Sequence, residues 1–351
     1  MRAVVVGLGS IGRRHARNWA KLGLGPVAAV RRRKSPLPEA LDFDIAEYTD
    51  LDQALRLERP DVVFVTNPTS LHVETACKAL QAGAHVFVEK PLGSALDGVA
   101  ELLRTARLSS RVLTVGYNLR FHPGLWRLKT LLQTDAVGNV ISARAEAGEY
   151  LPDWHAWEDY RLGYSGRGEM GGGAVLTFSH ELDALCWLLG PPRRVTAVAA
   201  HASSLEIDVE DVAEIALVFE SGAVGSVHVD YVRQPPRRTV EVVGERGVLR
   251  WEYERNRLEH YSVETGQWRI EQGDARYDRN QMYLDELRHF VKCVRGEIAQ
   301  ALIDGDQGAA VLAVALAALR AARDGVTVDF RQEDAAVRGW LSHLGVQIAN
   351  A

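Results

Sequence analysis

Residues 2–12 read RAVVVGLGSIG, a short β-branched run closed by three glycines. A run of this kind that stops at glycine is typical of a buried parallel strand. Residues 11–22, IGRRHARNWAKL, then place apolar side chains near one helical face, and Gly23 supplies a stop signal. Strand, glycine turn and helix in this order predict the first unit of a doubly wound sheet.

The same alternation continues through the first third of the chain. Apolar runs predict strands at 27–30, 61–66, 84–90 and 111–117, and helices at about 70–82 and 95–107. Right-handed crossovers between such strands cover both faces of a parallel sheet with helices. We therefore predict an N-terminal Rossmann domain over residues 1–120, with its ligand beyond the carboxyl ends of the strands.

The pattern changes after residue 120 to strands that follow one another without helices. These predicted strands are 139–149, 194–201, 212–219, 223–232, 239–243 and 248–253. Residues 121–351 therefore form a predicted α+β domain with a large open, mostly antiparallel sheet. We expect helices near 180–189, 280–296 and 306–323 to cover one face, with the C-terminal helices packing back on the first domain.

Composition excludes several classes of protein. The 351 residues are 47% apolar and 25% charged with a net charge of −5, which fits a globular two-domain chain and excludes a disordered or fibrous one. No long basic tract suits nucleic acid or an anionic membrane, and no run suggests a membrane span. Three isolated cysteines indicate reduced thiols and a cytoplasmic location, and the histidine spacings predict no metal site.

The glycines of the first turn match the GxGxxG pattern of dinucleotide-binding loops. Such a loop places a pyrophosphate on the helix N-terminus, and the residues expected to line it are Gly7, Gly9, Ser10, Ile11 and Gly12. The alternative is a glycine turn without a ligand. Strand before and helix after favour the binding loop.

Basic residues follow the second predicted strand. An acidic residue usually binds the adenosine ribose of NAD at this point, whereas here Arg31, Arg32 and Arg33 stand there. Guanidinium groups suit a 2′-phosphate, so we predict NADP in preference to NAD. The alternative is a solvated basic loop.

Four further segments carry a resemblance to a known family. They are TNPTSLH (66–72), EKP (89–91), GYNLRFHP (116–123) and GGGAVLTFSHELD (171–183). Together with the glycine loop, they make most of the chain similar to the Gfo/Idh/MocA family of sugar and cyclitol oxidoreductases. The resemblance implies a Rossmann domain followed by an open-sheet domain, and a homodimer or homotetramer.

The resemblance also implies roles for individual residues. Lys90 matches the lysine that contacts nicotinamide ribose and substrate, and His180 matches the general acid/base. The residues implied to face the cofactor are Thr66, Asn67, Pro68, His72 and Glu89, and those at the edge of the substrate pocket are Asn118 and Arg120. Thr177 stands where many members have an aspartate, so Lys90 and His180 are the catalytic pair that remains. Thr177 itself is a candidate substrate contact that could orient a hydroxyl group by hydrogen bonding.

The aromatic and polar segment 151–161 is a second candidate substrate surface. His155 and Tyr160 are our candidate substrate contacts, because aromatic faces pack on sugar C–H surfaces and polar groups bind hydroxyls. Arg167 is a weaker candidate for a phosphate or carboxylate. The alternative is a packed loop at a subunit interface.

These observations predict an NADP- or NAD-dependent oxidoreductase. Hydride would pass between the nicotinamide and a ring carbon of a sugar, amino sugar, nucleotide sugar or cyclitol. The alternatives are an NAD-dependent glycosidase that oxidises its substrate transiently, and a non-catalytic cofactor-sensing protein.

Overall fold

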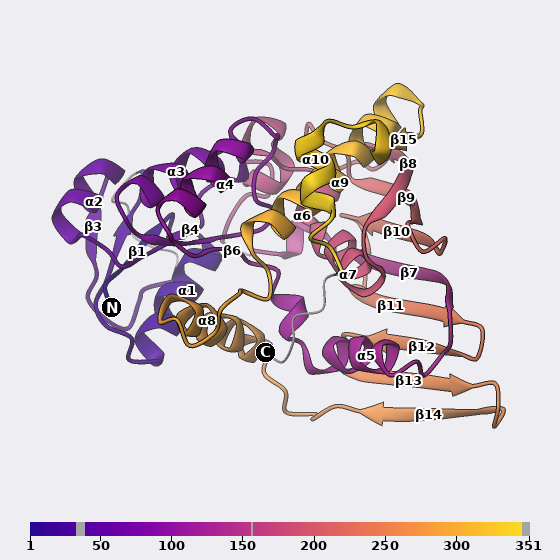
Figure 1. Cartoon of the computed structure of the whole chain (residues 1–351). Helices are drawn as coiled ribbons and strands as arrows, with labels where there is room; N and C mark the ends of the chain where they lie inside the picture. Colours follow the sequence, from indigo (N-terminus) through magenta and orange to yellow (C-terminus); the bar gives the residue numbers. More distant parts are fainter. Residues whose placement is uncertain (33–38, 156, 346–351) are drawn as a thin grey trace.

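The computed structural model describes residues 1–32, 39–155 and 157–345, and it contains two sheets joined through a layer of helices (Figure 1). The first sheet has six parallel strands in the order β3-β2-β1-β4-β5-β6. Its strands are β1 (Ala3–Val6), β2 (Val27–Val30), β3 (Ala46–Tyr48), β4 (Val62–Val65), β5 (His85–Val88) and β6 (Leu113–Val115). This confirms the predicted Rossmann sheet.

Helices cover both faces of this sheet. Helices α2 (Leu51–Glu58), α3 (His72–Gln81) and α4 (Val99–Leu108) pack on one face. The other face carries α1 (Ser10–Lys21) and α8 (Asn280–Val294), the latter from the last quarter of the chain. Phe290 of α8 lies 5.5 Å, centroid to centroid, from Phe87 of β5. The C-terminal part of the chain thus completes the core of the first sheet.

The second sheet has nine strands in the order β14-β13-β12-β11-β7-β10-β9-β8-β15. The long strands are β7 (Val140–Gly148), β8 (Pro192–Ala200), β9 (Val212–Phe219), β10 (Val224–Asp230), β11 (Arg237–Gly244) and β12 (Gly247–Glu252), and the remainder are β13 (Arg257–Ser262), β14 (Gln267–Gln272) and β15 (Val328–Asp329). Of the described strand pairs in this second sheet, β7–β10 alone is parallel, so the predicted mostly antiparallel sheet is confirmed.

Helices pack on the inner face of the second sheet. They are α5 (Pro123–Gln133), α6 (Ala174–Thr177), α7 (Ser179–Leu189), α9 (Gly305–Asp324) and α10 (Ala335–Leu341). Short 3-10 turns are η1 (Thr69–Leu71), η2 (Asn118–Phe121), η3 (Leu151–Asp153), η4 (Tyr164–Gly166), η5 (Gly168–Met170) and η6 (Phe330–Gln332). Within the described residues, α9 alone has the length and apolar composition of a membrane span, and 72% of that window is buried inside the fold, as in a core helix.

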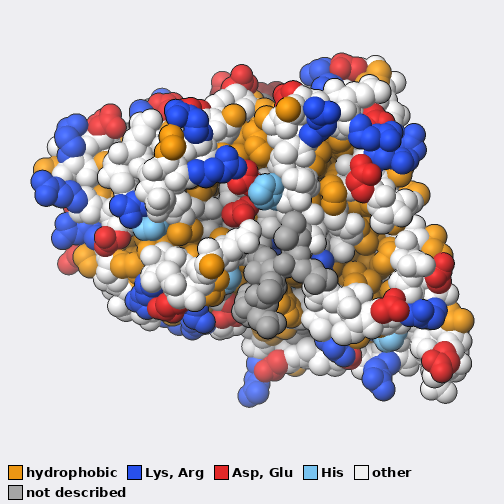
Figure 2. Space-filling view, in the orientation of Figure 1, with side chains coloured by type: hydrophobic (Ala, Val, Ile, Leu, Met, Phe, Trp, Pro, Cys, Tyr) orange, Lys and Arg blue, Asp and Glu red, His pale blue; other side chains and the backbone are white. Residues whose placement is uncertain are grey.

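The outer face of the second sheet is mixed in character. On β7, Ala143, Ala145 and Ala147 are buried, whereas Arg144 between them is exposed. Outward positions on neighbouring strands include the exposed Val198 and Val224. On the side of the molecule shown in Figure 2, acidic and basic side chains are interspersed with apolar ones. The expected homodimer or homotetramer stays a prediction.

A buried ion pair joins η2, after β6, to α7. The Arg120 guanidinium donates from Nη2 to Asp183 Oδ1 at 2.7 Å and from Nε to Oδ2 at 3.1 Å. Its Nη1 donates to the Leu302 carbonyl at 2.9 Å and to Gln307 Oε1 at 2.8 Å. Both charged side chains are at most 2% exposed, so neither charge is compensated by water.

Breaking this pair should destabilise the fold strongly. Because Arg120→Met leaves the Asp183 carboxylate buried and unpaired, we expect a loss of about 3–5 kcal/mol in the free energy of unfolding. Urea denaturation followed by circular dichroism measures this loss. The control is Arg104→Ala, which removes an exposed pair with Glu101 and should change stability by less than about 0.5 kcal/mol. Equal losses in the two variants would contradict the assignment.

Candidate active site

The glycine loop between β1 and α1 is tightly closed on one side and open on the other. A Cβ on Gly12 would lie 1.9 Å from the Gly7 carbonyl oxygen, and one on Gly7 would lie 2.7 Å from the Thr66 carbonyl oxygen. Gly7 also has a φ of +98°, which favours glycine. A Cβ on Gly9 would meet nothing within 4 Å. The open side therefore lies above Gly9, where the N-terminus of α1 begins.

This open side fits a pyrophosphate. Ser10 and Ile11 open α1, their side chains are half-buried, and the first turn contains no acidic residue. Free backbone N–H groups at a helix N-terminus attract anions, and an acidic side chain there would repel them. Gly9, Ser10 and Ile11 would hold the pyrophosphate of a dinucleotide, while Gly7 and Gly12 provide the close packing beneath it.

The basic residues after β2 are only partly available to a ligand. Arg31 Nη1 lies 3.2 Å from Glu47 Oε1 on the neighbouring strand β3. Arg32 is exposed, and Arg33 lies outside the described residues. Arg32 is therefore the described basic residue best placed for a charged group on the ribose.

The loop after β4 is held by hydrogen bonds to both neighbouring strand ends. Thr66 Oγ1 lies 2.9 Å from the Val6 carbonyl oxygen and 2.7 Å from that of Gly7. The buried His72 ring lies 2.9 Å from the Asn67 carbonyl oxygen and 2.8 Å from that of Pro91. His72 thus braces the loop from inside, and Asn67 and Pro68 are the more exposed members.

Glu89 and Lys90 follow β5 at the same edge of the sheet. Glu89 Oε1 accepts a hydrogen bond from His15 Nε2 of α1 at 2.8 Å, and Oε2 accepts one from the Lys90 backbone N–H at 3.2 Å. Glu89 is therefore engaged within the protein, where it fixes the start of the EKP turn.

Lys90 connects this edge to the second domain. Its Nζ donates a hydrogen bond to the Thr177 carbonyl oxygen at 2.5 Å. Thr177 ends α6, and His180 lies in the first turn of the next helix, α7. This contact brings Lys90, at the end of a strand of the first sheet, close to the helices that carry Thr177 and His180.

Burial and charge determine the protonation state of His180. Desolvation lowers the pKa of His180 well below its ordinary value, and the positive charges of Lys90, Arg238 and Arg279 lower the pKa further. Desolvation also lowers the pKa of Lys90. His180 Nδ1 is buried and has no hydrogen-bond partner in the described part of the chain. The ring is therefore neutral at pH 7 and able to accept a proton.

Thr177 does not face the site with its hydroxyl group. Thr177 Oγ1 accepts a hydrogen bond from the Tyr231 hydroxyl at 2.7 Å, and the side chain is 4% exposed. Its contribution to Lys90 is made by the backbone carbonyl instead. The Thr177 carbonyl oxygen is thus the described hydrogen-bond acceptor of Lys90 Nζ.

Asn118 and Arg120 lie in η2, just after β6, and both are buried. The Arg120 donors are occupied by Asp183, Leu302 and Gln307, as described above. Arg120 therefore stabilises the junction between the domains and has no described contact with a pocket.

Segment 151–161 approaches the glycine loop from the second domain. The Trp157 ring lies 5.5 Å from the guanidinium of Arg13, which follows Gly12, and it stacks on His155 at 5.1 Å. Tyr160 Oη accepts a hydrogen bond from the Glu206 N–H at 3.3 Å. Arg167 Nη2 contacts Glu169 at 2.9 Å. His155 is linked to the residue after the glycine loop through its stacking partner Trp157.

Several residues around the catalytic pair were not predicted from the sequence. Arg238 of β11 donates from Nε to Glu181 Oε1 at 2.7 Å. Arg279 precedes α8, and the nearby Tyr283 side chain raises the pKa of Arg279. Glu181 directly follows the candidate His180 in the sequence, and this adjacency was the one sequence feature that could have pointed to any of these residues. The others come together only through the tertiary fold.

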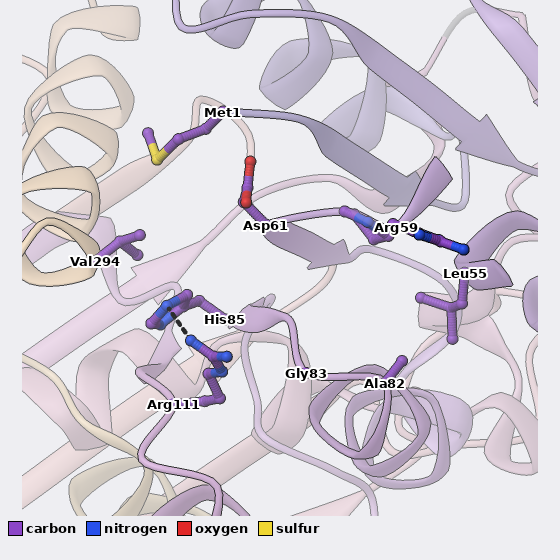
Figure 3. A pocket seen from close by; sticks show the side chains of 10 residues that line it. Met1, Leu55, Arg59, Asp61, Ala82, Gly83, His85, Arg111 and Val294 are labelled. Carbon is purple, nitrogen blue, oxygen red and sulfur yellow. Dashed lines mark hydrogen bonds between the residues drawn. The ribbon is translucent and has the colours of Figure 1, made fainter. Parts of the chain in front are cut away.

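One cavity in the described part of the chain lies away from this site. It has a volume of about 620 Å³ and is lined at the amino ends of the strands by Met1, Asp61, His85 and Arg111, among others (Figure 3). His85 contacts Arg111 there at 3.3 Å. In a parallel sheet this is the end opposite to the ligand edge, so the cavity is not the nicotinamide site.

Comparison with known proteins identifies the family. The model of the oxidoreductase family with an NAD-binding Rossmann fold (GFO_IDH_MocA) matches residues 1–117, and that of the GFO/IDH/MocA C-terminal domain matches residues 125–250. The chain belongs to the Gfo/Idh/MocA family of oxidoreductases, as its motifs predicted.

Individual relatives agree with this assignment. Myo-inositol 2-dehydrogenase of Thermotoga maritima is 29% identical over 341 residues, covering 91% of this chain and 95% of the relative. The 1,5-anhydro-D-fructose reductase of Ensifer adhaerens is 29% identical over 269 residues, covering 76% and 78%. The WlbA dehydrogenase of Bordetella pertussis, solved with NADH and UDP-GlcNAcA, shares the fold at a TM-score of 0.79 and 24% identity, covering 94% of this chain and 97% of that one.

The glycine loop yields a test that separates folding from binding. Because Gly9 has open space and a φ of −64°, Gly9→Ala should leave the thermal midpoint within about 2 °C of the parent. The added methyl group would occupy the place of the pyrophosphate, so we expect NAD(H) affinity to fall at least about tenfold. Fluorescence titration with NADH measures this. Unchanged affinity in a folded variant would exclude the loop as the binding site.

Proposed function

We propose that this protein transfers a hydride between a nicotinamide dinucleotide and a secondary alcohol or ketone carbon of a sugar or cyclitol. The observation that carries the proposal is the Lys90 Nζ contact with the Thr177 carbonyl at 2.5 Å, which brings Lys90 next to the helix of His180. The dinucleotide, when bound, supplies or accepts the hydride. The protein must in addition transfer one proton and stabilise the negative charge that develops on the reacting oxygen.

His180 and Lys90 divide these two tasks. A neutral imidazole accepts the hydroxyl proton during oxidation and returns it during reduction. The Lys90 ammonium stabilises negative charge as it develops on the reacting oxygen. Asn67 and Pro68 face the dinucleotide from the β4 edge, while Asn118, His155 and Tyr160 remain our proposed substrate neighbours.

Net hydride transfer is favoured over the two alternatives. The two relatives described above are a dehydrogenase and a reductase. A glycosidase with transient oxidation would release product without a net change in nicotinamide absorbance. A non-catalytic sensor would not need the Lys90–His180 arrangement.

Removing either catalytic side chain should abolish most turnover. We expect Lys90→Met and His180→Asn each to lower kcat by about 10²–10⁴-fold, because each removes one of the two groups that handle proton and charge. Nicotinamide absorbance, recorded with a panel that includes myo-inositol and 1,5-anhydro-D-fructose, measures turnover. Lys129→Met, which removes a partly buried lysine bonded to the Trp187 carbonyl, is the matched control. Parental turnover in either catalytic variant would refute the assignment.

The lowered pKa of His180 determines the pH dependence. A histidine with a lowered pKa loses its function as a base only when the pH falls below its ordinary value of about 6.5. We expect kcat/KM for alcohol oxidation to be level from about pH 6.5 to 8 and to fall at lower pH. His180→Asn should lack this acid limb. An acid limb centred above pH 7 would show that the ring is not held neutral.

We also propose that NADP is preferred to NAD, with Arg32 as the main contact for the 2′-phosphate. Arg32→Ala should raise the KM for NADP about tenfold and leave that for NAD within about twofold, because one charged hydrogen bond contributes roughly 1.5 kcal/mol. Initial rates at varied cofactor concentration measure both constants. Arg56→Ala, on α2, is the control. Equal use of both cofactors by the parent would instead favour a solvated basic loop.

A further inference from the structure

The cavity at the amino ends of the first sheet is large enough for a small organic molecule. Its lining comes from the loop between α2 and β4, the loop between α3 and β5, and Arg111 just before β6 (Figure 3). Its volume of about 620 Å³ lies within the range of small-molecule pockets, which is about 300–1,000 Å³. Because the dinucleotide loop is at the opposite end of the strands, a molecule in this cavity would be a separate ligand.

The hydrogen bonds of His85 determine which of its ring nitrogens carries a proton. His85 Nδ1 accepts a hydrogen bond from the Val112 backbone N–H at 3.0 Å. Desolvation and the positive charge of Arg111 lower the pKa of His85, so the ring is neutral at pH 7 and carries a single proton. Because Nδ1 is an acceptor, that proton is on Nε2.

Two hydrogen-bond donors consequently face each other in the cavity. Arg111 Nη1 lies 3.3 Å from His85 Nε2, and a guanidinium nitrogen has a donor but no acceptor to offer (Figure 3). Among the described residues, no carboxylate oxygen lies within 4.0 Å of the Arg111 guanidinium. The two N–H groups therefore lack an acceptor, and an anionic group beside both nitrogens would supply one.

The charges around the cavity favour a ligand with one negative charge. Of the side chains that line it, Arg59 and Arg111 are positive and Asp61 is negative, which leaves a net charge of 2 − 1 = +1 beside the neutral His85 ring. A monoanion balances this charge. A dianion would leave one negative charge uncompensated and would be repelled by the Asp61 carboxylate.

We propose that this cavity binds the carboxylate of a small organic acid, with His85 Nε2 and Arg111 Nη1 as the donors. A guanidinium and a carboxylate form short, charge-assisted hydrogen bonds, and the carboxylate has a further oxygen for the His85 donor. The apolar side chains of Leu55 and Val294 also line the cavity and would contact the carbon skeleton of the acid. The site does not depend on the proposed hydride transfer.

Acetate is the probe, because it carries the carboxylate with almost nothing else. About 50 mM acetate, compared with chloride at equal ionic strength, should raise the thermal midpoint of the full chain by about 2 °C. NADH is present throughout, so that the glycine loop adds no anion site. Arg111→Gln should reduce the shift to less than about 0.5 °C, because it removes the charged donor. Arg104→Gln, which removes an exposed arginine of α4, is the matched control and should keep the full shift.

A spectroscopic measurement tests the donor pair in the parent protein. NMR of the histidine ring nitrogens at about pH 7.5 should show His85 protonated at Nε2 and unprotonated at Nδ1, with its signals assigned by their loss in His85→Gln. A ring protonated at Nδ1 would overturn the proposal. It would also be overturned by an equal acetate shift in Arg111→Gln, by the lack of a shift in the parent, or by a larger shift with inorganic phosphate than with acetate.

Discussion

The site depends on one hydrogen bond between the two domains, from the Lys90 ammonium to the Thr177 carbonyl oxygen. A buried ammonium must find acceptors, because its loss of hydration is costly. The last carbonyls of a helix have no partner within the helix, and Thr177 ends α6. The Thr177 carbonyl oxygen therefore supplies the acceptor that the Lys90 ammonium requires, and Lys90 supplies the donor that this carbonyl lacks within the helix. The same bond determines how far the EKP turn stands from the helix that carries His180.

Positive charge accumulates around this bond, and that accumulation defines the chemistry. Burial lowers the pKa of His180 most, and the charges of Lys90, Arg238 and Arg279 lower it further. Glu181 compensates Arg238 directly at 2.7 Å. Thr177 brings no charge to this cluster, and only its backbone carbonyl contacts Lys90.

Local sequence patterns predicted most of the fold for identifiable reasons. Strands β1, β4 and β5 are apolar runs buried on both faces, and the period and the stop signals of such runs are unambiguous. Strand β14 was not predicted because its side chains are almost all exposed, so residues 267–272 show no alternation of buried and exposed side chains. Strand β3 was missed because its three residues, AEY, carry too little pattern.

Residues of the candidate site could be predicted from the sequence only where they belong to a local sequence motif. GxGxxG and EKP lie in the turns after β1 and β5, at the carboxyl edge of the first sheet, and their binding roles stay predictions. Arg120 was expected at the edge of the substrate pocket because the family resemblance implied it, whereas its buried partner Asp183 is distant in sequence. Arg238 and Arg279 carry no motif, and their proximity to His180 depends on how the second sheet and α8 pack. Such residues are found from tertiary structure alone.

The position of helix α8 in the first domain affects how the chain folds during synthesis. Phe290 and Leu287 of this helix fill the same core as Phe64 and Phe87, so the first sheet remains without part of its cover until the ribosome has made the last quarter of the chain. A fragment that stopped after β6 would expose these aromatic rings and tend to aggregate. The N-terminal domain is therefore a separate unit in space but not along the polypeptide, and it reaches its final form only after the second domain has been translated.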